Sequence, residues 1–292
     1  MLVSRQGRRE RAYQTGTGAT EDAASGRAAR PGGTVAVSPS SQPADRVAVV
    51  TGASSGIGAA LVRKLAGEGY TCVLLARREK LLRELAAEVG GEAEVCDVSD
   101  REAVERVGAA VLERHPRIAL LVNNAGMPAR TNFLGDPDRI EEVLRVNYLG
   151  SVWCLRAFLP GLEAARPSDV VNVVSVAGVV AAPSGGPYAA SKHAQLAFSR
   201  SVQPLLRGLG VRVHTVLPGP VETEGFPQRG RMGNRLLERT VAEPEQIANR
   251  IVSMVGRGRV ESFIPRWYRM LQVTQALAPG LIRLGARRYK WR

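Results

Sequence analysis

Cysteine and histidine are scarce in this chain of 292 residues, which contains three of each. Cys72, Cys96 and Cys154 stand at none of the spacings that metal sites use, and an odd, sparse set gives no disulfide framework. Their sequence neighbours are apolar, so we interpret all three as small core residues in a reducing compartment. The sequence therefore predicts no metal site.

Long apolar runs are also missing. No stretch of about 18 apolar residues occurs, which argues against a membrane-spanning helix. Residues 1–44 lack the apolar segment of a secretory signal, and their acidic residues count against a transit peptide. We expect a cytoplasmic protein, with membrane association left open for the C-terminal segment.

The formal net charge of +13 is concentrated at the two ends of the chain. Residues 1–44 carry +3 and residues 257–292 carry +8, which leaves +2 for everything between them. A nucleic-acid-binding domain would carry its basic stripe on the folded body, so we expect no nucleic-acid partner. A basic end can still meet anionic lipid or an acidic partner.

Three regions follow from composition. Residues 1–44 have no periodicity and are rich in small and polar residues, so we expect a disordered extension. Residues 45–264 form the predicted folded domain. Residues 265–292 form a basic C-terminal tail that mixes arginine with apolar and aromatic residues. Two interpretations of the tail stay open: peripheral membrane contact, or packing on the substrate lid or a second subunit.

Short β-branched runs alternate with amphipathic segments throughout residues 46–264, without a linker. We expect strands at 46–51, 71–76, 92–96, 118–123, 170–175, 211–217 and 262–264. We expect helices at 59–68, 79–89, 100–114, 137–162, 188–206 and 243–255. Pro204 should kink or end its helix, because proline has no backbone N–H. This alternation predicts an α/β fold, a single domain with a doubly wound parallel sheet.

A glycine-rich turn follows the first predicted strand and precedes the first helix. It reads Thr-Gly-Ala-Ser-Ser-Gly-Ile-Gly over residues 51–58. Glycines let a backbone approach a pyrophosphate closely, and the helix then points free N–H groups at it. The turn is therefore a predicted dinucleotide site, with contacts from Gly52, Ser54, Ser55, Gly56, Ile57 and Gly58.

The spacing Gly-x-x-x-Gly-x-Gly resembles the loop of the short-chain dehydrogenase/reductase family. The likeness extends from residue 46 to about 264 and includes Tyr188-Ala-Ala-Ser-Lys192. It implies a Rossmann-like fold, usually seven-stranded, and hydride transfer with a nicotinamide cofactor. It also implies a homodimer or homotetramer.

The end of the second strand indicates which nicotinamide cofactor is used. Folds that bind NAD place an acid there for the ribose 2′-hydroxyl, whereas arginine grips the 2′-phosphate of NADP(H). This chain has Arg77 and Arg78 and no acid. We therefore predict NADP(H), with Arg77 as the main contact and Arg78 in support.

Further cofactor contacts are implied by the resemblance. Asp97, followed by Val98, is placed to bond near the adenine. The turn Asn124-Ala125-Gly126 lines the cofactor and stabilises the sheet. Pro218, Gly219 and Thr223 match the turn that contacts the nicotinamide carboxamide and diphosphate, and residues 224–242 would form the substrate lid.

Tyr188 and Lys192 lie four residues apart, so they share one face of a helix. A nearby ammonium should lower the pKa of the phenol and make it a better acid or base near neutrality. The resemblance implies that Tyr188 exchanges the proton, that Ser175 binds the carbonyl oxygen and that Lys192 supports the phenolate and the cofactor. It implies that Asn147 holds a water linking Lys192 to solvent. For His115 and His214 the sequence identifies no partner.

These observations predict an NADP(H)-dependent oxidoreductase acting on a carbonyl or secondary alcohol of a small, apolar molecule. A 3-oxoacyl, lipid-like or steroid-like ketone would suit it. The alternative is a catalytically silent NADP-binding sensor or scaffold, which the intact Asn147, Ser175, Tyr188 and Lys192 argue against. An epimerase or dehydratase would need a longer C-terminal substrate domain than this chain has.

Overall fold

The computed structural model describes residues 46–181, 185–228, 238 and 240–282, all within the second of two compact units, Ser41–Arg292. The predicted disordered extension therefore lies outside the described residues, as do most of the predicted lid and the last ten residues of the tail. Within these ranges no helix combines the length and the hydropathy needed to cross a membrane.

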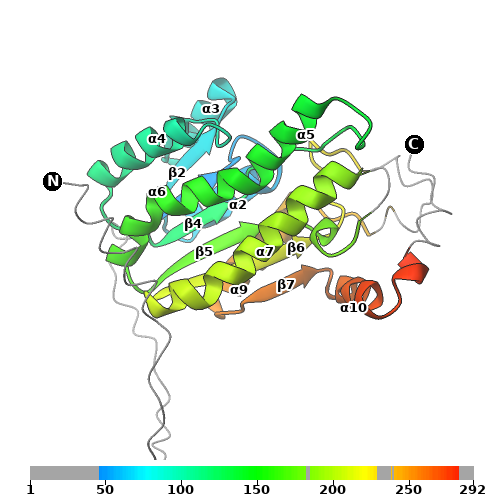
Figure 1. Cartoon of the computed structure of the whole chain (residues 1–292). Helices are drawn as coiled ribbons and strands as arrows, with labels where there is room; N and C mark the ends of the chain where they lie inside the picture. The colour runs from blue at the N-terminus through cyan, green and yellow to red at the C-terminus, as the bar shows by residue number, and fades with distance from the viewer. Residues whose placement is uncertain (1–45, 182–184, 229–237, 239, 283–292) are drawn as a thin grey trace, which may run out of the picture. The chain divides into compact units, whose positions relative to one another are not determined.

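Seven parallel strands form one sheet in the order β3-β2-β1-β4-β5-β6-β7 (Figure 1). The strands are β1 Val47–Thr51, β2 Thr71–Ala76, β3 Glu92–Val95, β4 Leu120–Asn123, β5 Ser168–Val173, β6 Val211–Pro218 and β7 Glu261–Ile264. The order reverses between β1 and β4, and ligands of such sheets bind at the carboxyl ends of the strands beside that switch. The predicted doubly wound, Rossmann-like fold is confirmed.

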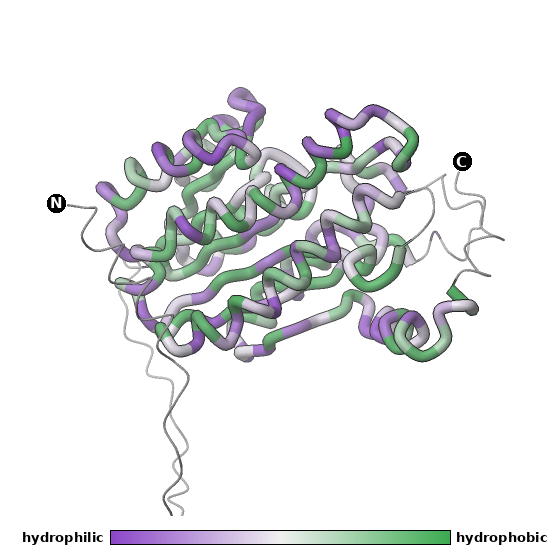
Figure 2. The backbone as a smooth tube through the Cα atoms, in the orientation of Figure 1, coloured by the Kyte–Doolittle hydropathy of each residue, from purple (hydrophilic) through white to green (hydrophobic). Residues whose placement is uncertain are grey.

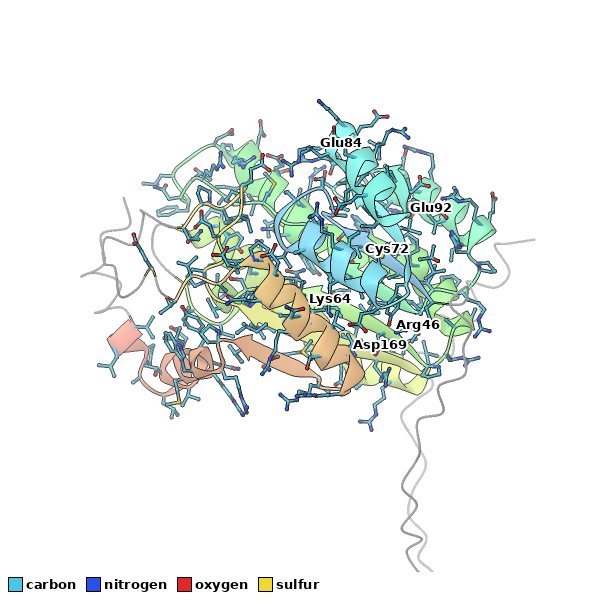
Figure 3. All side chains as sticks on the ribbon, turned by 180° about the vertical axis from the view of Figure 1, so that it is seen from behind. Arg46, Lys64, Cys72, Glu84, Glu92 and Asp169 are labelled. Carbon is cyan, nitrogen blue, oxygen red and sulfur yellow. The ribbon has the colours of Figure 1, made fainter. Side chains whose placement is uncertain are left out.

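Helices cover both faces of the sheet. They are α2 Gly56–Gly67, α3 Glu79–Val89, α4 Arg101–Arg114, α5 Pro137–Leu144, α6 Gly150–Ala164, α7 Gly186–Gly208, α9 Pro244–Gly256 and α10 Arg269–Leu277. Helices α2, α3 and α9 pack on one face, seen from behind in Figure 3, and α4, α6 and α7 pack on the other. Figure 2 shows the strands as mostly hydrophobic tube between helices of mixed polarity.

Strand β1 shows why both faces are buried. Ala48 and Val50 join the core under α2 and α9, whereas Val47 and Val49 join the core under α4 and α6. Because side chains alternate along a strand, an all-apolar run supplies both layers at once.

The helix predicted over residues 137–162 is present as a continuous helical segment, but it is not a regular α-helix throughout. A π-helical turn, η2 Arg145–Leu149, separates α5 from α6, and α6 continues to Ala164. Single π-helical turns of this kind occur frequently at functional sites. Asn147 is the buried polar residue of this turn.

Of the two alternatives for Pro204, α7 does not end there, and a kink stays a prediction. The helix continues four residues further, to Gly208. The cysteine prediction holds: Cys72, Cys96 and Cys154 are all free and buried.

Candidate active site

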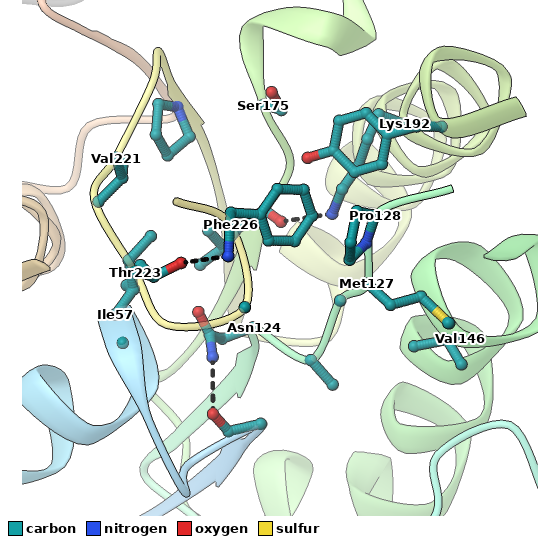
Figure 4. A pocket seen from close by; sticks show the side chains of 18 of the residues that line it. Ile57, Asn124, Met127, Pro128, Val146, Ser175, Lys192, Val221, Thr223 and Phe226 are labelled. Atoms are coloured by element: carbon teal, nitrogen blue, oxygen red, sulfur yellow. Dashed lines mark hydrogen bonds between the residues drawn. The ribbon is translucent and has the colours of Figure 1, made fainter. Parts of the chain in front are cut away.

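A cavity of about 780 Å³ opens at the carboxyl ends of the strands. Its walls come from the loop after β1, the ends of β2, β3, β4 and β5, helix α7 and the segment after β6. Figure 4 shows Ser175, Lys192, Phe226 and Pro128 around one end of this space, with Ile57 and Thr223 toward the glycine-rich loop. The sheet therefore brings together segments that are far apart in the sequence.

Nearly all of the predicted cofactor residues line this cavity. They are Gly52, Ser54, Ser55, Gly56, Ile57, Arg77, Arg78, Asp97, Val98, Asn124, Ala125, Gly126, Tyr188, Lys192, Pro218, Gly219 and Thr223. Gly58 does not line it. A Cβ at Gly58 would collide with the carbonyl oxygen of Gly52, so this glycine lets α2 pack against the turn.

The turn after β4 is tied to the turn after β1. The Thr51 hydroxyl accepts from the backbone N–H groups of Asn124 and Ala125, at 3.0 Å each, and donates to Val122 O at 3.2 Å. The Asn124 amide donates to Thr51 O at 3.0 Å. Thr51 thus fixes the two loops that flank the switch point, a role that the sequence alone did not reveal.

The two arginines after β2 differ in their contacts. Arg77 is exposed and lies 3.5 Å from the Asp97 carboxylate. Arg78 donates to the hydroxyls of Ser54, at 3.2 Å, and Ser55, and pairs with Glu224 at 3.0 Å. Arg78 therefore lies against the glycine-rich loop itself, the part of the cavity where phosphates are expected.

Tyr188 and Ser175 lie at the end of the cavity away from the glycine-rich loop. Both side chains line the cavity, and the Ser175 side chain lies close enough to Tyr188 to lower the pKa of the phenol. Ser175 lies two residues beyond β5, just before the short helix η3 Val176–Gly178, and its oxygen accepts from Ala177 N at 3.1 Å. A carbonyl oxygen placed here would have two hydroxyl donors.

Lys192 is almost fully buried, with 3% of its surface exposed. Its ammonium donates to Val173 O at 3.2 Å and to Gln195 Oε1 at 2.8 Å, and it lies 6.0 Å from the centre of the Tyr188 ring. Gln195 in turn donates to the Ser151 hydroxyl at 2.8 Å. All hydrogen-bond partners of Lys192 in the structure are neutral oxygens.

The expected lowering of the Tyr188 pKa is not what the structure gives. Burial raises the pKa of Tyr188 to about 12, against a smaller opposing effect of the Ser175 side chain. Burial also lowers the pKa of Lys192 to about 7. The ammonium is directed at Val173 and Gln195 rather than at the phenol oxygen, so desolvation outweighs its attraction for a phenolate.

Asn147 is buried behind the cavity and does not line it. Its amide oxygen accepts from Met127 N at 2.8 Å, and its nitrogen donates to Met127 O at 3.1 Å and to Ser191 Oγ at 2.9 Å. Ser191 donates to Tyr188 O at 2.7 Å. These bonds connect the π-helical turn to the first turns of α7, and so to Tyr188.

Apolar side chains line the space in front of Tyr188. They include Met127, Pro128, Val146 and Phe226. The Phe226 ring lies 5.6 Å from the Tyr188 ring, centre to centre, and its backbone N–H donates to Thr223 Oγ1 at 3.1 Å. Sequence reasoning did not single out Phe226, because nothing in the segment after Thr223 signals that it folds back over the tyrosine.

The residues present fit a dinucleotide. One end of the cavity is lined by Arg77, Arg78 and Asp97. From there the cavity passes the N-terminus of α2 and reaches Tyr188 and Lys192. The first turn of α2 contains no acidic residue, and its N-cap, Ser55, makes no side-chain cap. Its backbone N–H groups therefore suit an anionic ligand. No group of three or more metal-ligating side chains occurs in the described ranges.

Comparison with known proteins agrees with this geometry. The sequence profile of the family "short chain dehydrogenase" matches residues 46–232. A 1-deoxy-11-beta-hydroxypentalenate dehydrogenase of Streptomyces exfoliatus is 37% identical over 190 residues, covering 61% of this chain and 68% of that protein. A farnesol dehydrogenase of Aedes aegypti is 35% identical over 226 residues, covering 73% and 91%.

Solved structures show the same fold with nicotinamide cofactors. A short chain dehydrogenase from Burkholderia cenocepacia J2315, in complex with NADP, superposes with a TM-score of 0.70 at 27% identity, covering 84% of this chain and 99% of that chain. Another similar structure was solved with NAD, so the fold alone does not choose between the two. The chain is therefore an NAD(P)-dependent oxidoreductase acting on CH–OH groups, and it belongs to the short-chain dehydrogenase family.

Proposed function

We propose that this protein uses NADP(H) to interconvert a ketone and a secondary alcohol of a small, apolar substrate. The observation that carries the proposal is the meeting of Ser175, Tyr188 and Lys192 at one end of a cavity whose other end is the glycine-rich loop. The hydroxyl pair suits a carbonyl oxygen, and the apolar wall beside it suits the rest of such a substrate.

The proposed chemistry divides among three side chains. Ser175 donates a hydrogen bond to the substrate carbonyl oxygen, and Tyr188 gives that oxygen a proton as negative charge develops on it. A nicotinamide cofactor, when bound, supplies the hydride in reduction and accepts it in oxidation. Lys192, with a pKa of about 7, is partly protonated near neutrality. Its charge favours the phenolate form that Tyr188 adopts after giving up its proton.

Asn147 has a positioning role in this scheme. Its amide holds the backbone of Met127 on the cavity wall and, through Ser191, the first turn of α7. The water between Lys192 and solvent that the family resemblance implies for Asn147 stays a prediction.

The preference for NADP(H) rests on Arg77 and Arg78. Both line the cavity, and no acid occupies the end of β2 to bind a ribose 2′-hydroxyl. We expect Arg77→Ala and Arg78→Ala each to lower kcat/KM for NADPH by roughly tenfold to a hundredfold, because each removes a charge-assisted bond, and to spare NADH. Arg83→Ala, which breaks an exposed pair with Glu79 on α3, is the matched control. Equal use of NADH and NADPH by the wild type would overturn the preference.

An apolar substrate is supported by the cavity wall formed by Met127, Pro128, Val146 and Phe226. The names of the two relatives above, a hydroxypentalenate dehydrogenase and a farnesol dehydrogenase, support the same class. We propose a 3-oxoacyl, lipid-like or steroid-like ketone.

The test is NADPH oxidation against a panel of ketones, aldehydes, 3-oxoacyl thioesters and steroids, run in parallel with Tyr188→Phe. Turnover that disappears in the variant, while NADPH binding survives, supports the mechanism and identifies the substrate class. Tight NADPH binding without turnover on any member of the panel would overturn the proposed activity in favour of a silent NADP-binding sensor.

We also expect a homodimer or homotetramer, on the family resemblance. The mass of the purified protein by light scattering tests this directly. A monomer at micromolar concentration contradicts it.

A further inference from the structure

The segment after β7 gathers exposed apolar side chains. Twelve large apolar side chains are exposed in the described part of the chain, and five of them lie between Trp267 and Leu281. A monomeric surface seldom keeps such a group exposed unless something covers it in use. We refer to Trp267, Met270, Val273, Leu277 and Leu281 as the apolar stripe.

Helix α10 turns its apolar side outward. Met270, Val273 and Leu277 follow one another at helical spacing on one face, and they are 62%, 43% and 81% exposed. No residue of α10 is buried, and only Leu271 packs partly against the core. An ordinary surface helix places its apolar face on the protein, so this helix has the opposite orientation.

The segment is nevertheless firmly attached beside the cavity. Tyr268, just before α10, is 7% exposed and packs with Leu217 and Phe263. A Cβ at Gly219 would collide with its ring, and Gly219 N donates to Ile264 O at 2.8 Å. Because Gly219 also lines the cavity, the apolar stripe lies at the same edge of the sheet as the cavity, where Figure 1 shows β7 leading into α10.

The charge around the apolar stripe indicates which kind of partner could bind it. After Glu261 the sequence contains seven arginine and lysine residues and no acidic residue, and Arg266 and Arg269 are exposed at the start of the stripe. A second copy of the same segment would bring like charges together, which disfavours self-association through this face. An anionic lipid surface offers negative charge and an apolar interior side by side, and tryptophan prefers that boundary.

We propose that the apolar stripe is a docking surface for an anionic lipid bilayer. Met270, Val273, Leu277 and Leu281 enter the acyl boundary, Trp267 lies at headgroup level, and Arg266 and Arg269 contact lipid phosphates. The mouth of the cavity is then held close to the membrane. This inference goes beyond the proposed oxidoreductase activity and does not depend on it.

The test is flotation of the full-length protein with two kinds of vesicle: equal parts phosphatidylglycerol and phosphatidylcholine, and phosphatidylcholine alone. We expect binding to the anionic vesicles that weakens as salt rises, because exposed charges are screened. The double variant Met270→Gln/Leu277→Gln should weaken that binding by roughly tenfold or more, since two apolar side chains are lost from the buried face. Both side chains are exposed, so the fold should be retained, and circular dichroism checks it.

The matched control is Leu205→Gln/Leu209→Gln, which removes two exposed leucines at the end of α7, on the opposite edge of the sheet. It should float like the wild type. The proposal is overturned if the wild type does not bind anionic vesicles, or if the stripe variant binds them as well as the control does. If the wild type does not float and the stripe variant splits an oligomer in light scattering, the stripe is a contact between subunits, which also overturns the proposal. None of these outcomes depends on turnover.

Discussion

A buried ionisable side chain lies at each end of strand β5, Asp169 of the strand itself and Lys192 of helix α7, and the two are surrounded very differently. Asp169, at the amino end, accepts two hydrogen bonds from Arg212, at 2.8 and 2.7 Å, and lies 2.7 Å from His214 Nε2. Lys192 bonds to the carboxyl end, through Val173 O, and has only neutral hydrogen-bond acceptors. Asp169, labelled in Figure 3, lies at the amino end of β5, whereas the cavity lies at the carboxyl ends of the strands.

The difference between Asp169 and Lys192 is that one buried charge has a partner of opposite charge and the other does not. At Asp169 opposite charges are paired, and the hydrogen bond to the carboxylate raises the pKa of Arg212 above its ordinary value although burial opposes it. At Lys192 no counter-charge is present in its hydrogen-bonding shell, and burial lowers its pKa to about 7. A paired buried charge contributes to structure, whereas an unpaired one is kept near its titration point, as acid–base chemistry at neutrality requires.

The largest expected effect comes from removing the unpaired charge. Lys192→Met should lower kcat by roughly 10²- to 10⁴-fold, the usual contribution of acid–base catalysis. It should leave the free energy of unfolding unchanged or slightly higher, because it replaces a desolvated ammonium by an apolar side chain of similar length. Steady-state kinetics and urea unfolding measure the two. A strongly destabilised but active variant would contradict the comparison.

The reverse pattern is expected at the other end of β5. Asp169→Asn should lower the free energy of unfolding by about 1.5 kcal/mol, because the charge-assisted bonds to the half-exposed Arg212 and the buried hydrogen bond to His214 are weakened. Activity per folded molecule should stay within about twofold, since the site lies at the far edge of the sheet. Glu88→Gln, in an exposed pair with Arg63, is the control and should change stability by less than about 1 kcal/mol. Equal losses in the two variants would show that the buried cluster contributes nothing special.

Stability should also depend on pH through Lys192. Its pKa is about 7 in the folded protein and higher when unfolded, so between these values the unfolded chain binds more protons. Wild-type stability relative to Lys192→Met should therefore rise as the pH rises above 7, by at most about 1.4 kcal/mol per pH unit. Urea unfolding of both proteins from pH 6.5 to about 9.5 measures this, a range that ends below the raised pKa of Tyr188. A flat difference would mean that Lys192 titrates normally.

The smallest change tests the comparison most finely. Gln195→Glu keeps the shape of the side chain and gives Lys192 a counter-charge, which makes its surroundings resemble those of Asp169. The pKa of Lys192 should rise, the pH dependence just described should weaken, and the pH–kcat profile should move to higher pH. Gln195→Met, which removes the acceptor without adding charge, should move the profile the other way. Identical profiles for all three proteins would rule out Gln195 as a positioning residue for Lys192.

Local sequence patterns were enough to predict the doubly wound sheet and most of the residues around the cavity. Buried strands and glycine-rich turns are encoded over a few neighbouring residues, so the turn over residues 51–58 and the pair Tyr188–Lys192 could be recognised directly. Contacts between distant segments could not. The partners of His214 and His115 are Asp169 and Glu92, and the polar chain Lys192–Gln195–Ser151 crosses between two helices.

The pKa of Tyr188 shows the same limit. Spacing along a helix places an ammonium near a phenol, but burial and the direction in which Lys192 points are set by the sheet and by α6. The turn at residues 145–149 was missed because no proline or glycine within it marks a break in the helix.

That π-helical turn has a consequence for sequence length. It holds one residue more than an α-helical turn, so it behaves as a single insertion carried within a continuous helical rod. Deleting one residue between Arg145 and Leu149 would allow a regular helix, and it would rotate α5 by about 100° relative to α6. A helix made more regular in this way would turn Asn147 away from Met127 and Ser191. A chain one residue shorter at this place would keep its fold and lose the alignment of its tyrosine.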